Sequence, residues 1–227
     1  MFFVRSKRDF SALGAVALFF VTLPAFVQAS PKSVGAKHLK LASTDRREES
    51  LLKAKAQVLA LLQDENACSA WFRESDSDPA GVFNSLHFQM EEAKPSYVQF
   101  ILDLHHNDVV KHPWVARSWQ LTGRNSTVKL NLDGAFFNTS STMVELAPGG
   151  GVARYLGFRM LTVGPFKGGT SEAQITTLLH ELGHITDRIP QDDDSWDGKS
   201  SRNTEEVLIH CRKEIHEFAK RNFGERE

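Results

Sequence analysis

Residues 171–185 read Ser-Glu-Ala-Gln-Ile-Thr-Thr-Leu-Leu-His-Glu-Leu-Gly-His-Ile, and the rest of the chain is interpreted around this stretch. Its apolar residues recur at helical spacing and form one stripe: Ile175, Leu178, Leu182 and Ile185. The opposite side carries Ala173, Thr177, His180, His184 and, just beyond the stretch, Asp187. Ser171 and Gln174 have the spacing of a capping box, so we expect the helix to begin there. The pattern predicts a helix with one face in a core and the other lining a cleft.

Residues 180–184 of this helix form an HExxH motif. Histidines four positions apart project from the same helix face, so His180 and His184 can reach one metal ion. Glu181 points to a neighbouring angle, where it can hold a metal-bound water and accept its proton. Zinc lowers the pKa of such a water to about 7. The motif therefore predicts a zinc site with a catalytic glutamate. The alternative is an ordinary amphipathic helix whose histidines are solvated.

The segment 177–185 resembles the active-site helix of the zincin metallopeptidases, which is uncharged around the two histidines, and in particular a small exported bacterial zincin-like protein. The resemblance implies that His180 and His184 are zinc ligands and that Glu181 is the general base of peptide-bond hydrolysis. It also implies an α+β fold, with a small mixed or antiparallel sheet packed on the HExxH helix and with N-terminal and C-terminal helices. In zincins an edge strand beside this helix binds extended peptide by main-chain hydrogen bonds.

The metzincin extension of the motif is absent from this chain. Asp187 stands where that pattern has its glycine, and Pro190 stands where it has its last histidine. Asp187 also makes a poor third ligand, because a residue seven positions after His180 lies about 10 Å further along the same helix. A helix-end role or a hydrogen bond to His184 suits Asp187 better.

Two downstream carboxylates are the main candidates for the third zinc ligand. Glu205 follows His184 at an interval close to the one at which thermolysin-like gluzincins supply a glutamate from the next helix. Asp197 is the alternative, as in aspzincin-type sites, and the acidic residues 192–194 are further candidates. We expect Asn203 to cap the last helix, which would leave Glu205 free to turn towards the metal.

The N-terminal residues 1–29 have the form of a secretory signal peptide. A basic start precedes an apolar run over 10–23 that is too short to span a bilayer comfortably, and Ala29 ends a small-residue cleavage site. We expect a flexible leader over 30–47 and a single zincin-like domain over 48–227. An uncleaved membrane anchor is the alternative. The protein is therefore expected to be secreted or periplasmic, with no membrane attachment after cleavage.

The two cysteines and the charge fit that compartment. In an oxidising compartment Cys68 and Cys211 most simply form one disulfide, which would stabilise the folded state by about 4 kcal/mol. Two buried free thiols are the alternative. The net charge is −1 and no basic stripe with interleaved aromatic residues is present, which argues against a nucleic-acid partner. The expected partner is a peptide or protein substrate.

Hydrophobic periodicity predicts the remaining elements. They are a helix over 48–62, strands over 97–104 and 127–132, a hairpin made of 142–146 and 152–163, and a last helix over 204–222. A second function fits the same sequence, namely a secreted zinc-binding protein that acts as an interaction module without turnover. Such a structural site is closed by four protein ligands, whereas a catalytic site keeps a position for water.

Overall fold

The computed structural model describes residues 34–92, 99–103, 108–112, 114–146, 152–192 and 198–221. Over these residues the chain forms five α-helices and nine short strands, so the predicted α+β class is confirmed. The helices are α1 (Val34–Gln63), α2 (Ala67–Arg73), α3 (Pro79–Asn84), α4 (Ser171–Ile185) and α5 (Lys199–Ala219). The predicted signal peptide lies outside the described residues. No helix in the described part is both long and apolar enough to cross a membrane.

The described strands form three small sheets instead of one. The first is mixed: β1 (His87–Glu91) runs parallel to β5 (Thr127–Asn131), and β4 (Ala116–Arg117) pairs antiparallel with the other side of β5. The second is antiparallel, with the order β2 (Gln99–Asp103), β3 (Asp108–His112), β6 (Ser140–Leu146) and β7 (Val152–Met160). The third pairs β8 (Thr162–Val163) with β9 (Phe166–Lys167). The predicted strand over 127–132 and the predicted hairpin pairing are thus confirmed, and the described part of the predicted strand over 97–104 forms β2. The second hairpin strand was predicted to run to residue 163, but it ends at Met160, because Thr162 and Val163 pair with β9 instead.

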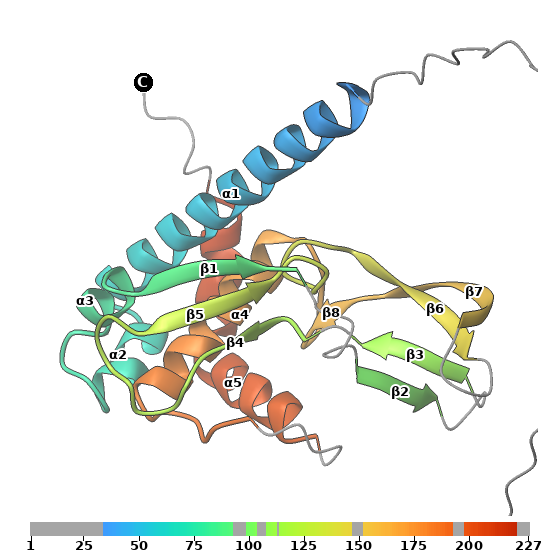
Figure 1. The fold of residues 1–227 in the computed structure, drawn as a ribbon. Helices are drawn as coiled ribbons and strands as arrows, with labels where there is room; N and C mark the ends of the chain where they lie inside the picture. Colours follow the sequence, from blue (N-terminus) through green and yellow to red (C-terminus); the bar gives the residue numbers. More distant parts are fainter. Residues whose placement is uncertain are drawn as a thin grey trace, which may run out of the picture.

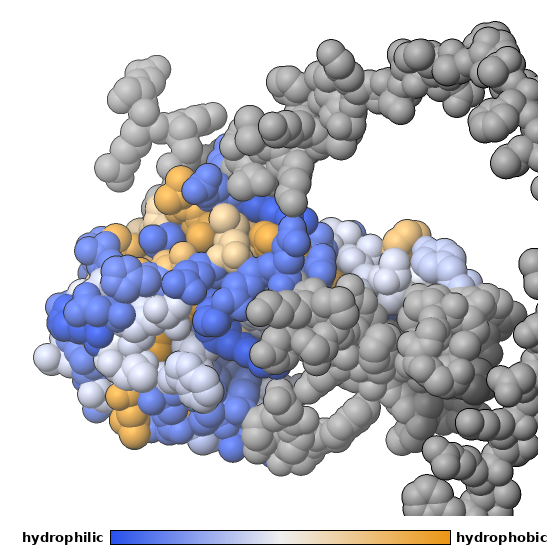
Figure 2. Space-filling view, in the orientation of Figure 1, coloured by the Kyte–Doolittle hydropathy of each residue, from blue (hydrophilic) through white to orange (hydrophobic). Residues whose placement is uncertain are grey.

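The four-stranded sheet extends to one side, away from α2 to α5 (Figure 1). The first sheet instead lies with the helices, and β4 contacts α4 directly. The visible face over the helices and the first sheet is mainly hydrophilic, interrupted by small apolar patches (Figure 2). The HExxH helix therefore belongs to the helical part of the molecule, where the short strands β4, β8 and β9 contact it.

Helix α4 lies in the middle of the core, packed against both α1 and α5. Its apolar stripe is buried as predicted, with Ile175, Leu178 and Leu182 at most 1% exposed. The opposite face is buried as well, because α5 and the segments next to α4 cover it; His180 is 6% exposed and His184 is 1% exposed. The expectation of an open cleft along that face therefore needs correction. The histidines lie in a nearly closed environment.

Helix α1 begins at Val34, well before the predicted start at residue 48, so most of the expected leader is helical. From Leu51 onward its core face has helical spacing, with Leu51, Ala54, Val58 and Leu61 all buried. Gln57, which is fully buried, donates a 3.0 Å hydrogen bond to the carbonyl of Phe218 at the end of α5. This bond satisfies a helix-end carbonyl and fixes α5 against α1.

The predicted disulfide between Cys68 and Cys211 is confirmed. It joins α2 to α5, and both sulfur-bearing residues are fully buried. The two residues are 143 positions apart, so the bond closes a loop that contains most of the described chain. Cross-linking a loop of that length removes much of the conformational freedom of the unfolded chain.

We expect the double variant Cys68→Ala/Cys211→Ala to lose about 5 kcal/mol of unfolding free energy, slightly more than the value expected from the sequence, because the loop-entropy relation gives about that value for a separation of 143 residues. Urea unfolding of the metal-free protein, followed by circular dichroism, measures the change. The oxidised wild type and the wild type treated with reductant in denaturant provide the controls. An unfolding free energy equal to that of the oxidised wild type would contradict a stabilising role for the bond.

Candidate metal centre

The start of α4 differs by one residue from the predicted capping box. Thr170 is the N-cap, and its hydroxyl accepts a 3.3 Å hydrogen bond from the backbone N–H of Ala173. The side chain of Gln174 does not return to the cap, since it donates instead to the carbonyl of Phe136 at 3.0 Å. Gln174 thereby ties the first turn of α4 to the loop after β5. The predicted cap at Ser171 is wrong because this tertiary hydrogen bond takes Gln174 away from the helix end.

The end of α4 reverses the chain so that it returns along the helix. Asp187 has a left-handed φ of 60°, and the N–H of Arg188 donates to the carbonyl of Gly183 at 2.8 Å. The N–H of Asp187 itself donates to the carbonyl of His184 at 3.2 Å. This pair of bonds is the Schellman helix ending, in which glycine is the usual left-handed residue and aspartate is tolerated. The predicted helix-end role of Asp187 is the one that the structure shows.

Gly183 makes room for the returning chain. A Cβ atom at this position would lie 2.9 Å from Cγ1 of Ile189, closer than side chains tolerate. Ile189, which is 1% exposed, packs there against the helix. The glycine of the motif therefore brings the segment after the turn close to the two histidines.

Two glutamines hold this returning segment to the residues that follow β4. The backbone N–H of Gln120 donates to Oε1 of Gln191 at 2.7 Å, and the N–H of Gln191 donates to Oε1 of Gln120 at 3.1 Å. Gln120 also donates through Nε2 to Oδ1 of Asp187 at 2.6 Å, and Gln191 donates to the carbonyl of Ser118 at 3.2 Å. These bonds place the residue after Gln191, which is Asp192, beside the HExxH helix.

His180, His184 and Asp192 form the one group of potential metal-ligating side chains found in the described part of the chain. Nε2 of His184 lies 2.9 Å from Nε2 of His180. Nε2 of His180 lies 3.0 Å from Oδ2 of Asp192, and Nε2 of His184 lies 3.5 Å from Oδ1. The three side chains thus form a small triangle, in which both carboxylate oxygens of Asp192 face the Nε2 atoms of the two histidines.

The triangle has the dimensions of a tetrahedral zinc site. Zinc binds imidazole nitrogen and carboxylate oxygen at about 2.0–2.1 Å, which puts neighbouring ligand atoms about 3.3 Å apart in a tetrahedron. The two histidine nitrogens are 2.9 Å apart, and each lies near one carboxylate oxygen of Asp192, at 3.0 Å for Oδ2 and 3.5 Å for Oδ1, so the separations lie near that value. Three protein ligands also leave a fourth position for water. In type and in spacing, the three side chains are therefore ones that could hold a metal ion.

The ionisable side chains at this site shift the pKa values of one another. Burial lowers the pKa of His180, but its hydrogen bond to Asp192 and the carboxylate charges of Glu181 and Asp192 outweigh burial and raise the pKa above its ordinary value. Burial raises the pKa of Asp192, but its hydrogen bonds to His180 and His184 outweigh burial and hold the pKa well below its usual range. Asp192 is therefore an ionised carboxylate facing the histidines, which is the state that a cation needs.

Glu181 lies next to this group and is 4% exposed. Burial raises its pKa, against the opposing charges of His180 and His184. One carboxylate oxygen, Oε2, is buried with no hydrogen-bond partner among the described residues. A buried carboxylate oxygen without a partner is costly in free energy. A water molecule on a bound metal would supply the missing donor, so this oxygen also fits a metal site.

Helix α5 supplies two side chains that contact the ligands. Oγ1 of Thr204 lies 3.1 Å from Nδ1 of His180, and Nδ2 of Asn203 donates to Oδ1 of Asp192 at 2.6 Å. The predicted capping role of Asn203 is wrong, because α5 begins at Lys199 after a left-handed Gly198 with no side-chain cap. Asn203 lies instead on the buried side of the helix, where its side chain turns towards the HExxH motif.

The structure does not bring Glu205 to the histidines. Its side chain is 57% exposed and pairs with Arg212 on the same helix at 3.1 Å. It belongs to the solvent side of α5, whereas the preceding residue, Thr204, is buried against His180. Among the described residues Asp192 takes the place that the sequence assigned to Glu205. The other candidate, Asp197, lies outside the described residues.

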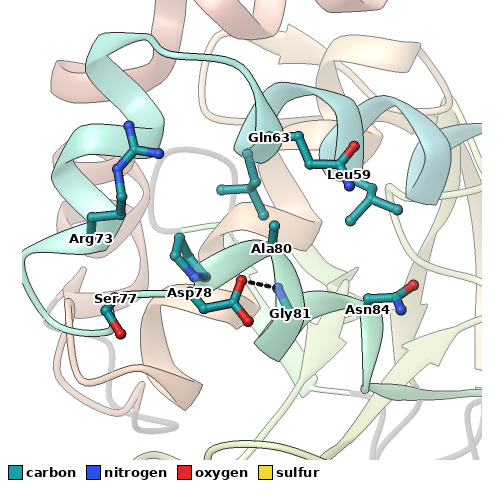
Figure 3. A pocket seen from close by; sticks show the side chains of 10 residues that line it. Leu59, Gln63, Arg73, Ser77, Asp78, Ala80, Gly81 and Asn84 are labelled. Carbon is teal, nitrogen blue, oxygen red and sulfur yellow. Dashed lines mark hydrogen bonds between the residues drawn. The ribbon is translucent and has the colours of Figure 1, made fainter.

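A separate surface pocket of about 430 Å³ lies between α1, α2 and α3, well away from the histidines in the chain (Figure 3). Its charged groups already have partners: Arg73 pairs with Glu65 at 2.9 Å, and Asp78 pairs with Arg124 at 2.8 Å. Asp78 also caps α3 by accepting from the N–H of Gly81. We therefore interpret this pocket as packing between helix ends, and the metal centre remains the candidate site.

Comparison with known proteins adds no family to this picture. Neither the scan against protein-family models nor the searches of curated proteins and solved structures finds a match. The functional interpretation therefore rests on the residues and their geometry.

Proposed function

We propose that this protein is a zinc-dependent peptidase that is exported from the cytoplasm, as its N-terminal sequence predicts. The observation that carries the proposal is the triangle of His180, His184 and Asp192 beside a buried Glu181 carboxylate. Glu181 precedes the second histidine on the same helix, as peptidase chemistry requires of the general base. No other group in the described part of the chain combines metal-ligating and acid–base side chains in this way.

In this proposal three residues bind the metal ion and a fourth transfers protons. His180, His184 and Asp192 would hold the ion. A bound zinc ion lowers the pKa of a coordinated water to about 7 and polarises a carbonyl oxygen. Glu181 accepts the proton of the attacking water and then transfers it to the leaving amine of the peptide.

The edge strand β4 offers a place for an extended peptide. It pairs with β5 on one side, and no described strand pairs with its other side. The chain after β4 then runs along α4, where the hydroxyl of Ser118 donates to the carbonyl of Glu181 and the N–H of Leu121 donates to that of His184. A peptide added to this edge by main-chain hydrogen bonds would pass the metal centre. Trp119 and Leu121, which are 74% and 70% exposed, support a preference for apolar substrate side chains.

A non-catalytic zinc-binding protein is the second candidate, and the burial of the site favours it. With His180 and His184 at most 6% exposed, a substrate carbonyl has little direct access to the metal in this conformation. The side chain of Asp192 is 27% exposed, so it marks the side from which the site can be reached. A fourth protein ligand on that side would close the site and make it structural.

Zinc stoichiometry and a peptide-library digest together test the proposal on the full chain from Ser30, purified with its disulfide formed. We expect about one zinc per chain by mass spectrometry, peptide cleavage that a chelator abolishes, and recovery of cleavage when zinc is restored. Absence of zinc after loading would contradict both candidate functions. Bound zinc without cleavage of any library member would contradict the peptidase and support the non-catalytic zinc-binding protein.

A further inference from the structure

Helix α5 gives no ligand to the triangle, yet its first turns contact two of the three ligands. Thr204 contacts His180 and Asn203 contacts Asp192, at 3.1 and 2.6 Å respectively. Both side chains are at least nine-tenths buried, since Asn203 is 5% exposed and Thr204 is 8% exposed. Buried polar side chains are costly unless they form hydrogen bonds, and these two form theirs with the candidate ligands. Their neighbour Glu205 is exposed on the solvent side of the helix and contacts neither ligand.

The hydroxyl of Thr204 determines which nitrogen of His180 carries the proton. A hydroxyl has a single hydrogen, and Thr204 donates it to the carbonyl of Ser200 at 3.0 Å. Its oxygen is then free only to accept, so Nδ1 of His180 must be the donor in their 3.1 Å contact. With the proton on Nδ1, Nε2 can give up the proton that it shares with Asp192 when a metal binds, and its lone pair then faces the same side as Nε2 of His184 and Oδ2 of Asp192. That is the tautomer which binds a metal through Nε2.

Asn203 fixes the orientation of the Asp192 carboxylate. Its Nδ2 group donates to Oδ1 of Asp192 and also to the carbonyl of Pro190 at 2.8 Å. The two acceptors lie on either side of Gln191, which is itself held by Gln120. Asp192 thus has one oxygen anchored by Asn203, while its other oxygen, Oδ2, faces His180 at 3.0 Å. An amide donor suits this role because it neither carries a charge nor competes for the cation.

We propose that Asn203 and Thr204 are positioning residues for the metal centre, with Thr204 setting the tautomer of His180 and Asn203 orienting the carboxylate of Asp192. The proposal rests on the proposed function, because it assumes that the triangle binds zinc. It makes α5 the element that organises the site, although α5 contributes none of its ligands. Docking of α5 through the Cys68–Cys211 disulfide and through Gln57 then contributes to metal affinity.

The test measures the zinc dissociation constant by competition with a chromophoric chelator, using the full oxidised chain from Ser30. Loss of a hydrogen bond that orients a ligand typically weakens metal binding by about 10–100-fold. We expect that loss in Thr204→Val, which keeps the shape of the side chain, and in Asn203→Ala. Thr204→Ser keeps the hydroxyl and is expected to stay within about threefold of the wild type. Glu205→Gln, the adjacent exposed position, is the matched control and should bind zinc like the wild type.

A double-variant comparison separates positioning from a general loss of stability. If Asn203 acts through Asp192, then Asn203→Ala should weaken zinc binding in the wild type and have little effect in an Asp192→Ala background. Circular dichroism of each metal-free variant checks that it has the same fold as the metal-free wild type. Wild-type affinity in both Thr204→Val and Asn203→Ala, or an equal loss in the Asp192→Ala background, would overturn the positioning role while leaving the zinc site in place. A wild type that binds no zinc would instead overturn the proposed function, and this inference with it.

Discussion

Replacing His184 with alanine is expected to weaken zinc binding so far that dialysis removes the ion, whereas the wild type keeps about one zinc ion per chain. His184 is 1% exposed, and its Nε2 atom lies within 3.5 Å of both partner ligands. Structural zinc sites with four ligands bind with about 10–16 kcal/mol, or roughly 2.5–4 kcal/mol for each ligand. Loss of one ligand should therefore weaken binding by about 10²–10³-fold. We expect His180→Ala and Asp192→Ala to have effects of the same order.

The same measurement decides the third ligand. Asp192→Ala should lose zinc affinity, whereas Glu205→Ala should retain it, because Glu205 pairs with Arg212 on the exposed side of α5. Asp197→Ala tests the remaining prediction from the sequence. Chelator competition gives the dissociation constants, and thermal unfolding of the metal-free proteins checks that each variant is folded. Unchanged affinity in Asp192→Ala, with a loss in Glu205→Ala or Asp197→Ala, would show that the carboxylate is supplied from elsewhere.

The motif and its helix could be predicted from the sequence because both depend on local spacing. Apolar residues at intervals of three and four specified the buried stripe of α4, and histidines four apart had to share a face. The strand over 127–132 followed from alternation in the same way, and β5 occupies Thr127–Asn131. The disulfide needed only two cysteines and an oxidising compartment.

Asp192 was only one of several candidate third ligands in the sequence, because its position beside the histidines depends on how the chain leaves α4. In the sequence, Asp187 and Pro190 showed only that the metzincin extension of the motif is absent. In the structure Asp187 adopts the left-handed conformation that glycine has at such helix ends, and the chain returns to place Asp192 beside the histidines. A signal was available, since aspartate is among the few residues that tolerate that conformation. The gluzincin interval favoured Glu205, but the structure places its side chain on the exposed side of α5, because α5 begins at Lys199 and turns Thr204 towards His180.

The burial of the polar face of α4 also had no local signal. Histidines, threonines and a glutamate on one side of a helix predict that this side is exposed to solvent. In the structure, α5 and the segment after β4 pack over this polar face and bury it. The sequence in fact contains the polar groups that make this burial tolerable. Thr176 and Thr177 return their hydroxyls to carbonyls one turn earlier in α4, at 2.7 and 2.8 Å, so neither leaves an unpaired donor in the core.

Glu181→Gln is expected to abolish turnover while leaving zinc bound. The substitution preserves the size of the side chain but removes the base that accepts the proton of the attacking water. General base catalysis contributes about 10²–10⁴-fold to rate, so cleavage of the best library peptide should fall by at least that range. Zinc affinity should stay within a few-fold of the wild type, since Glu181 is outside the group of ligands. Rates from single-peptide assays, measured beside zinc content in the same samples, give both quantities.

The expected stability of Glu181→Gln distinguishes a loss of catalysis from a loss of folding. Burial raises the pKa of Glu181, which means that the ionised carboxylate is held in the core at a cost in free energy. The neutral amide avoids that cost, so the metal-free variant should be at least as stable as the wild type at neutral pH, and its inactivity cannot be attributed to unfolding. Glu172→Gln is the matched control, because the same substitution in the first turn of α4 removes an ion pair with His216 at 3.7 Å and touches no ligand. If Glu181→Gln cleaved peptide at the wild-type rate, a different group would have to accept the proton and Glu181 would be a buried structural carboxylate.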